Sequence, residues 1–181
     1  MFDPRGAWLP RRWRGSGLGR TAAGALASPR HRDPATGALE VPYVKGACLL
    51  TTREVWQRTG PLDERFFLYF EETDWCHRAR AGGGRVYLCP DVQVRHLEGQ
   101  ATGQVSEFSL RQFQHSYRLY LRKHQGEAAV RCVRRAQAFE YRWKAWWRGR
   151  SRRPADRALA ARYRAIARLQ DMDDVAPDRP R

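Results

Sequence analysis

The chain has 181 residues, of which 42% are hydrophobic and 12% aromatic, and its formal net charge is +15. This composition excludes an intrinsically disordered chain, and the length suffices for one domain or for a smaller core with appended helices. The sequence contains no run of about 18 or more apolar residues, so it predicts no membrane-spanning helix.

The positive charge lies in the two flanks of the sequence. Residues 41–104 contain eight basic and eight acidic side chains, whereas residues 105–181 contain 19 basic and 8 acidic ones. The first 40 residues contribute seven basic and three acidic side chains. The basic flanks therefore predict a docking surface, chiefly at the C-terminal side, and the charge says nothing about a site in the neutral middle.

The four cysteines are widely spaced and form no C-x-x-C pair. They are Cys48, Cys76, Cys89 and Cys132. This spacing indicates free thiols in a reducing cytoplasm, and it argues against both a disulfide framework and a zinc site.

The first predicted elements follow an irregular start. Residues 1–40 are rich in Arg, Gly, Pro and Ala and show no periodicity, so they are predicted to be loop-rich. The apolar run "VPYVKGACLL" at residues 41–50 predicts a buried strand. Thr51 and Glu54 form a capping box for a short helix that Gly60 ends.

Helices dominate the remainder of the chain. A second helix is predicted to begin at Glu71 and to end at Gly82. Two strands follow it, and after them the apolar residues recur with helical spacing. The remaining predicted elements are strands at 85–89 and 92–96, helices at 108–126, 127–148 and 155–170, and a tail at 171–181.

The stretch "FFLYFEETDWC", residues 66–76, places three carboxylates beside a group of aromatic side chains. Acids in the first turn of a helix are stabilised by its dipole and free amides, which suffices to explain one or two of them. Glu71, Glu72 and Asp74 lie within four positions, where like charges repel each other. Such a cluster indicates a cation or a catalytic demand, and helix capping stays the alternative.

Five short motifs follow one another between residues 41 and 126. They are Gly46-Ala47, Gly60 to Phe67, Glu71 to Arg78, Gly84 to Pro90, and Val94 to His96. Together with the helical segment "SYRLYLRKHQG", they closely resemble the second half of the catalytic domain of family 2 glycosyltransferases. The likeness is greatest to the bacterial rhamnosyltransferase-like branch, and a signature of this length and order is specific.

The resemblance implies an α/β fold, namely a partial GT-A sheet of the nucleotide-diphospho-sugar transferase type with a helical C-terminal extension. It implies an inverting, metal-dependent transfer of a sugar from a nucleotide-sugar donor to a glycan or lipid-linked acceptor in cell-envelope polysaccharide synthesis. The predicted parts are an irregular segment 1–40, the glycosyltransferase segment 41–126, a basic amphipathic helical extension 127–170 and a disordered tail 171–181.

The resemblance also assigns roles to the acidic cluster. In this family the second acid of the pair is the general base, which corresponds to Glu72 here. An acceptor hydroxyl is a poor nucleophile until a positioned base removes its proton. The usual residue at this position is Asp, and Glu is one methylene longer. The acceptor-binding residues implied by the resemblance are Glu71, Asp74, Trp75, Gly46 and Ala47.

The metal site implied by the resemblance is incomplete in this sequence. His96 matches the histidine that helps to hold a divalent cation, Mg²⁺ or Mn²⁺, on the donor diphosphate. The family's first half, with its nucleotide-binding strands and metal-binding D-x-D, has no counterpart in the sequence. The "DMDD" of residues 171–174 follows a predicted helix and not a buried strand. We therefore expect a truncated or split glycosyltransferase whose cation binds only with a separate N-terminal half.

Two non-catalytic functions compete with this interpretation. A basic, Trp-containing flank suggests a nucleic-acid-binding module, but no reader motif is present, so no nucleic-acid partner is expected. The stretch "FEYRWKAWWRGRSRR", residues 139–153, suggests an interfacial helix on an anionic membrane surface, because its aromatic residues fall near one helical face. Packing of these aromatics onto the catalytic core is the alternative. We expect a cytoplasmic protein that could lie at the inner face of the plasma membrane.

The purified 181-residue chain is expected to bind nucleotide sugars weakly and to transfer none by itself. A cation held by His96 alone is weakly bound, because divalent cations in such sites draw on several ligands together. Calorimetry with a nucleotide sugar and Mn²⁺ or Mg²⁺ measures this affinity, and the same titration with an N-terminal half restored is the control. Tight binding by the short chain would contradict the expected need for that half.

Overall fold

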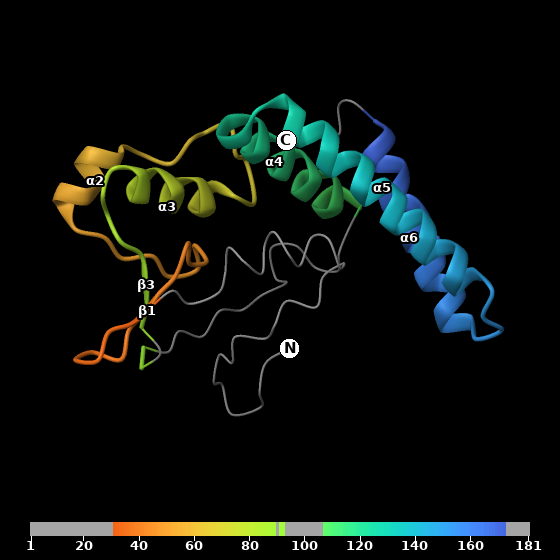
Figure 1. The fold of residues 1–181 in the computed structure, drawn as a ribbon, viewed down its shortest axis with the longest axis horizontal. Coiled ribbons are helices and arrows are strands. Elements are labelled where there is room, and N and C mark those ends of the chain that lie inside the picture. The colour runs from red at the N-terminus through yellow and green to blue at the C-terminus, as the bar shows by residue number, and fades with distance from the viewer. Residues whose placement is uncertain (1–30, 90, 93–106, 173–181) are drawn as a thin grey trace. The chain divides into compact units, whose positions relative to one another are not determined.

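The structure is a computed structural model of the chain, and it describes residues 31–89, 91–92 and 107–172 (Figure 1). These residues fall into two compact units, one within Met1–Ala101 and one within Thr102–Arg181. Each unit is described by itself. Within the described ranges, no helix is long and apolar enough to cross a bilayer.

The first unit contains a small antiparallel sheet. Its strands are β1 (His31–Arg32), β2 (Leu39–Glu40) and β3 (Tyr87–Leu88), in the order β1-β2-β3. The turn between β1 and β2 forms because the Asp33 carboxylate accepts a hydrogen bond from the Ala35 amide at 2.8 Å. Gly37 closes the turn with a φ of 67°. Periodicity predicted no strand before residue 41, since a strand of two residues is too short to show any.

The strand predicted at 41–50 does not form. Only Val41 continues the ladder, by donating its backbone N–H to the Val86 carbonyl at 2.9 Å. In the rest of the segment, a loop, Tyr43, Val44 and Leu49 pack on the core around Trp75 and Cys76, whereas Leu50 is 93% exposed. The apolar run thus marked burial only in part, and burial does not determine backbone conformation.

Two helices complete the first unit. Helix α2 (Arg53–Thr59) begins one residue later than the predicted capping box, because the Thr52 hydroxyl accepts from the Val55 amide at 3.3 Å. Gly60 ends it with a φ of 78°, as predicted. Helix α3 (Glu71–Ala81) begins at Glu71 and is capped by Gly82, as predicted.

Side chains of α3 hold the loop that joins it to α2. The Trp75 indole donates to the Gly60 carbonyl at 2.8 Å. The Arg78 guanidinium donates to the Thr59 and Pro61 carbonyls and to the buried Asp74 carboxylate, the last at 2.9 Å. One arginine therefore satisfies two backbone carbonyls and one buried charge.

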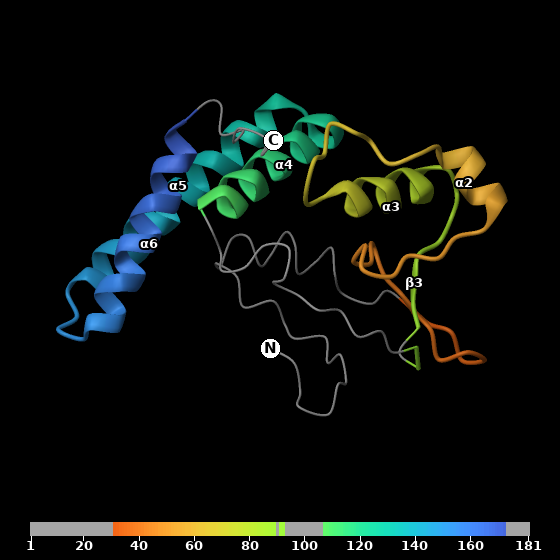
Figure 2. The same ribbon diagram turned by 180° about the vertical axis from the view of Figure 1, so that it is seen from behind.

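The second unit contains three described helices. They are α4 (Glu107–Gln125), α5 (Glu127–Gly149) and α6 (Pro154–Asp171), which agree with the predicted extents. Gly126, with a φ of 83°, allows the chain to turn between α4 and α5. Helices α5 and α6 lie side by side in both views (Figures 1 and 2). Helix α4 belongs to this unit, although the glycosyltransferase segment was predicted to extend to residue 126.

Burial explains why α5 and α6 pack together as a helical hairpin. Ala160, Ile166, Ala167 and Leu169 of α6 are buried. The buried Arg118 of α4 donates to the carbonyls of Leu169 and Met172, the last turn of α6 and the residue after it. Apolar packing and this capping of bare carbonyls together fix the end of the hairpin.

Replacing Arg78 by alanine is expected to lower the free energy of unfolding by about 3 kcal/mol, because it leaves the Asp74 carboxylate buried without its cation. Urea denaturation measures the change. Arg53→Ala, at an exposed arginine of α2, is the control. Equal stability of the two variants would show that the Asp74–Arg78 pair does not hold α3 in place.

Candidate active site at the start of helix α3

The chain enters α3 through two residues with unusual backbone conformations. Tyr69 and Phe70 have φ values of 68° and 70°, the left-handed region that non-glycine residues rarely occupy. Each such residue costs about 1–3 kcal/mol, and strain of this kind concentrates at functional sites. The turn that they form leads directly into Glu71 and Glu72.

Glu72 and Gly46, two residues implicated by the resemblance, lie together. A methyl group built on Gly46 would lie 3.4 Å from Glu72 Cβ and 3.9 Å from Glu72 Cδ. The loop backbone at Gly46 therefore runs close beside the glutamate side chain. Ala47 follows in the same loop and is exposed. The first turn of α3 and this loop form the candidate site.

Two carboxylate oxygens in this site are buried without a partner among the described residues. Oε2 of Glu71 and Oε2 of Glu72 are both shielded from solvent and accept no hydrogen bond from any residue that the structure describes. A buried polar atom of this kind needs an explanation, because its burial costs free energy that a partner would normally offset. Two such oxygens on neighbouring residues indicate a site that receives a proton, a cation or a polar ligand.

The electrostatics of the site centre on negative charge. Burial raises the pKa of Glu71, and the charge of Glu72 raises it further, against an opposing backbone hydrogen bond. Burial and the Glu72 charge also raise the pKa of Tyr43. The Cys76 thiol has its pKa raised mainly by burial, with Glu72 again contributing and Arg80 opposing. Glu72 therefore influences three titratable groups around it.

Asp74 and Trp75, two of the acceptor-binding residues that the resemblance implied, are buried in this structure. The Asp74 side chain is fully buried and bound to Arg78, and Trp75 is 3% exposed. Trp75 also stacks on Trp56, with ring centroids 5.8 Å apart. The expected contact of these two side chains with an acceptor stays a prediction. Both side chains hold α3 in place, and through it they position Glu71 and Glu72.

The expected metal ligand cannot be placed. His96 lies outside the described residues. In the part of the chain that the structure describes, no group of three or more His, Cys, Asp and Glu side chains is arranged to hold a metal ion. The unpartnered oxygens of Glu71 and Glu72 are of the type that Mg²⁺ and Mn²⁺ prefer, but two oxygens fill only part of such a coordination shell.

Sequence reasoning missed two contributors to the site. Tyr43 lies in the segment predicted as a strand, and nothing in its pattern pointed to Glu72. Arg78 was noted only as part of a motif, although its spacing of four from Asp74 is typical of an ion pair on one helix face. That spacing could have revealed the role of Asp74.

Comparison with known proteins tests the family resemblance. The family described as "Glycosyltransferase like family 2" matches residues 31–117, which include α2, α3 and the loop at Gly46. Residues 31–117 therefore resemble glycosyltransferase family 2. The expected resemblance to family 2 glycosyltransferases is confirmed, and this resemblance is to enzymes.

Curated relatives narrow the resemblance. The low-salt glycan biosynthesis hexosyltransferase Agl10 of Haloferax volcanii is 32% identical over 81 residues, 45% of this chain and 24% of the relative. The N-acetylglucosaminyl-diphospho-decaprenol L-rhamnosyltransferase of Mycobacterium tuberculosis is 38% identical over 64 residues, 35% of this chain and 20% of the relative. The dTDP-rhamnosyl transferase RfbF of Shigella flexneri is 32% identical over 50 residues, 28% of this chain and 17% of the relative.

Two of these three relatives are named as rhamnosyltransferases, as expected, and all three matches are partial. The chain spans about a quarter or less of the length of these relatives. No solved structure matches the chain significantly. The family implies the nucleotide-diphospho-sugar transferase fold, whereas the described residues are mostly helical, with one sheet of three very short strands. The predicted partial GT-A sheet is therefore not reproduced in full.

Replacing Glu71 by glutamine is expected to stabilise the fold at neutral pH. The folded chain holds the Glu71 proton more tightly than the unfolded chain, so the wild type loses stability as the pH rises from about 4.5 through the raised pKa. The variant lacks this loss of stability. Urea denaturation at about pH 5 and about pH 7 measures the change in the free energy of unfolding for both proteins.

Glu64→Gln, at an exposed loop glutamate, is the matched control and should leave the pH dependence of stability unchanged. A Glu71→Gln protein that is no more stable than the wild type at neutral pH would show that this carboxylate is not under electrostatic strain.

Proposed function

We propose that this chain acts in the transfer of a sugar from a nucleotide-sugar donor to a glycan or lipid-linked acceptor, with Glu72 as the general base. One observation carries the proposal. Within the segment that matches the family, neighbouring carboxylates at the start of α3 each keep a buried oxygen without a partner among the described residues, beside the Gly46 loop. A free carboxylate oxygen in a shielded position is what a base acting on a hydroxyl requires.

The chemistry assigned to Glu72 is a proton transfer. As the acceptor oxygen attacks the anomeric carbon, Glu72 takes the hydroxyl proton. The bond from the anomeric carbon to the acceptor oxygen forms while the bond to the nucleoside diphosphate breaks. Attack from the opposite side inverts the anomeric centre. Gly46 has no side chain of its own beside Glu72, and we propose that the acceptor hydroxyl approaches from this side.

Glu71 and the buried Asp74–Arg78 ion pair have supporting roles in the proposed reaction. Glu71 offers its second oxygen for a hydrogen bond to the acceptor sugar. Asp74, Trp75 and Arg78 keep the first turn of α3 in register with the loop, so that the base keeps its position. Preorganisation of this kind accounts for much of the advantage that a positioned base has over water.

A divalent cation is part of the proposal but lies outside the steps derived above. When bound, Mg²⁺ or Mn²⁺ would neutralise charge on the departing diphosphate. His96 is proposed as one ligand. Glu71 lies in the same first turn as the base and would add an oxygen ligand, which fits the preference of these ions for oxygen.

The named relatives suggest which substrates to test first. One is a dTDP-rhamnosyl transferase, and another is an L-rhamnosyltransferase named for N-acetylglucosaminyl-diphospho-decaprenol. We therefore propose dTDP-rhamnose as the first donor and a polyprenyl-diphosphate-linked sugar as the first acceptor. We propose that the protein is cytoplasmic and acts in the synthesis of cell-envelope polysaccharide, where such a donor and acceptor would both be present.

Glu72→Gln is expected to lower the rate of transfer by a factor of about 10² to 10⁴, the usual contribution of a general base, and to leave donor affinity unchanged. Glutamine keeps the shape of the side chain but cannot take the proton. Product formation from radiolabelled dTDP-rhamnose measures the rate, and calorimetry measures donor affinity. Both are measured on the chain alone and on a form extended by the expected nucleotide-binding half.

Glu64→Gln is the control and should transfer at the wild-type rate. An active Glu72→Gln protein would mean that another residue is the base. A variant that also loses donor affinity would assign Glu72 to binding, and not to proton transfer.

A further inference from the structure

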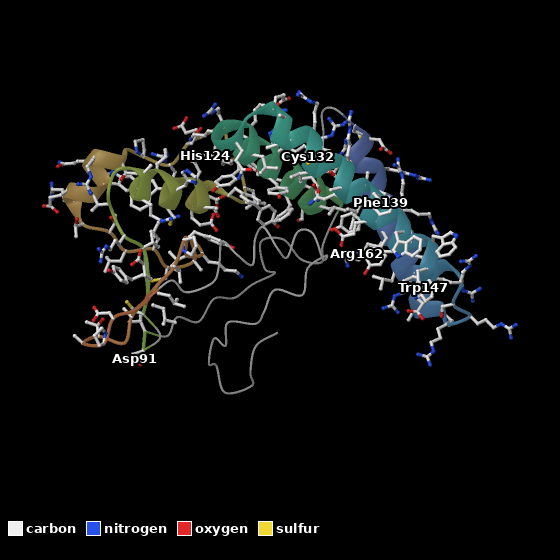
Figure 3. The ribbon with its side chains drawn as sticks, viewed as in Figure 1. Asp91, His124, Cys132, Phe139, Trp147 and Arg162 are labelled. Atoms are coloured by element: carbon white, nitrogen blue, oxygen red, sulfur yellow. The ribbon has the colours of Figure 1, made fainter. Side chains whose placement is uncertain are left out.

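Helix α5 presents an aromatic face that the helices of its own unit do not cover. Phe139, Trp143, Trp146 and Trp147 are 71%, 56%, 47% and 64% exposed. Their spacing of three and four residues places them on one side of the helix. Figure 3 shows Phe139 and Trp147 along α5, with Trp147 close to the loop that leads to α6. We call these four side chains the aromatic face.

The opposite side of α5 is the one that packs within the unit. Val130, Gln137, Ala138 and Ala145 are buried there, and α5 contacts both α4 and α6. The buried residues are small or polar, and Tyr141 is half-buried against Tyr163 of α6, whereas all three tryptophans of the helix face outward. An ordinary amphipathic helix of a monomer has the reverse arrangement. The aromatic face is therefore built for a partner outside the helical unit.

The tryptophans of this face are ordered by contacts with one another. The Trp143 and Trp146 rings stack at 5.1 Å and 25°, and the Trp146 and Trp147 rings are 6.2 Å apart. The Arg150 guanidinium lies 3.5 Å from the centroid of the Trp146 ring. Ring faces engaged in this way are less open to stacking with nucleic-acid bases, while ring edges and indole N–H groups stay available.

The α5–α6 hairpin carries a large excess of positive charge. Residues 127–171 contain thirteen basic and four acidic side chains. Each of the four acids is already held in an ion pair within the chain. The pairs are Glu127 with Arg122, Glu140 with Lys144, Asp156 with Arg148, and Asp171 with Arg142. Most of the remaining arginines are exposed, among them Arg131, Arg135 and Arg150.

The tip of the hairpin concentrates both features. Arg150, Arg152 and Arg153 are exposed in the loop between α5 and α6. A shallow hollow there is lined by Trp147, Arg148, Arg150, Ser151, Arg153 and Asp156. An arginine-lined hollow beside tryptophans suits a phosphate group that lies at the boundary between an apolar and an aqueous phase.

From this geometry we propose that the α5–α6 hairpin docks on the surface of an anionic lipid bilayer. The aromatic face enters the headgroup region, where tryptophan is favoured because its apolar ring and its N–H are both satisfied. The exposed arginines bind lipid phosphates. The aromatic residues span only about two turns of helix, which indicates shallow insertion. The proposal does not depend on the transferase activity proposed above.

Vesicle co-sedimentation of the complete chain tests the proposal. The chain is expected to bind vesicles of phosphatidylcholine with about 30% phosphatidylglycerol, and to bind pure phosphatidylcholine at least about tenfold more weakly. Raising the salt from about 0.1 M to about 1 M should release it, because the screening length falls from about 10 Å to about 3 Å.

Variants separate the aromatic and the cationic contributions. Trp143→Gln, Trp146→Gln and Trp147→Gln together should weaken binding to the anionic vesicles by about tenfold or more. Leu50→Gln, at a 93% exposed apolar residue of the other unit, is the matched control and should bind as the wild type does. If circular dichroism shows that the triple variant has lost helix, Phe139→Gln takes its place.

The charge variants follow the same design. Arg150→Gln, Arg152→Gln and Arg153→Gln together should weaken binding to anionic vesicles and leave binding to neutral vesicles unchanged. The same three-charge change at Arg53, Arg58 and Arg85, exposed arginines of the other unit, is the control for net charge. Equal losses in both sets would assign the attraction to overall charge and overturn the assigned surface.

Three results would overturn the proposal outright. One is the absence of binding to anionic vesicles at low salt. Another is a dimer that disappears in the triple tryptophan variant while vesicles are not bound, which would make the aromatic face a contact between copies of the chain. The last is tight binding to a DNA or RNA oligonucleotide without vesicle binding, which would make the basic hairpin a nucleic-acid surface.

Discussion

The buried ion pair between Asp74 and Arg78 is the interaction on which the first unit depends. A carboxylate without solvent access is tolerated only with a fixed counter-charge, and Arg78 supplies one while also capping the loop after α2. The same helix carries Glu71 and Glu72 on its first turn. Stability and site are thus joined, since anything that loosens Arg78 also moves the carboxylates proposed for chemistry.

The acidic cluster divides into two kinds of carboxylate. Asp74 is buried and fully engaged, whereas Glu71 and Glu72 each keep an oxygen without a partner in the described part of the chain. Three adjacent acids therefore have two functions, which explains why simple helix capping and a catalytic site both seemed reasonable from sequence. The strained turn at Tyr69 and Phe70 also favours a functional site, because an unfavourable backbone conformation is kept where the chain leads into the two glutamates.

Helix boundaries could be predicted because their signals are local. Gly60, Gly82 and Gly126 end helices where expected, and the helical spacing after residue 107 gave three helices of the right extent. The segment 41–50 could not be predicted as a loop, since an apolar run looks the same in a strand and in a loop that covers a core. Likewise, the N-cap moved from Thr51 to Thr52 because two adjacent hydroxyls offer the same signal.

The site could be predicted in part for a similar reason. The position of Glu72 beside Gly46 follows a motif that keeps the two residues in order along the chain. The burial of Asp74 and Trp75 depends on which way α3 faces, and neither the motif nor the spacing of three between acids determines that. The exposure of the tryptophans on α5 could not be predicted either, because the same sequence pattern fits a helix face that packs on a core and one that is left uncovered.

The distribution of the thiols has a practical consequence. Cys76 is buried and its pKa is raised, so its thiolate is disfavoured, whereas Cys48, Cys89 and Cys132 are exposed. Cys132 stands on α5, seven residues and thus about two turns before Phe139, on the same side of the helix (Figure 3). With Cys48 and Cys89 changed to serine, a spin label or fluorophore attached under native conditions would therefore sit at Cys132 alone. The chain thus carries its own attachment point for a probe of how that side of α5 is solvated.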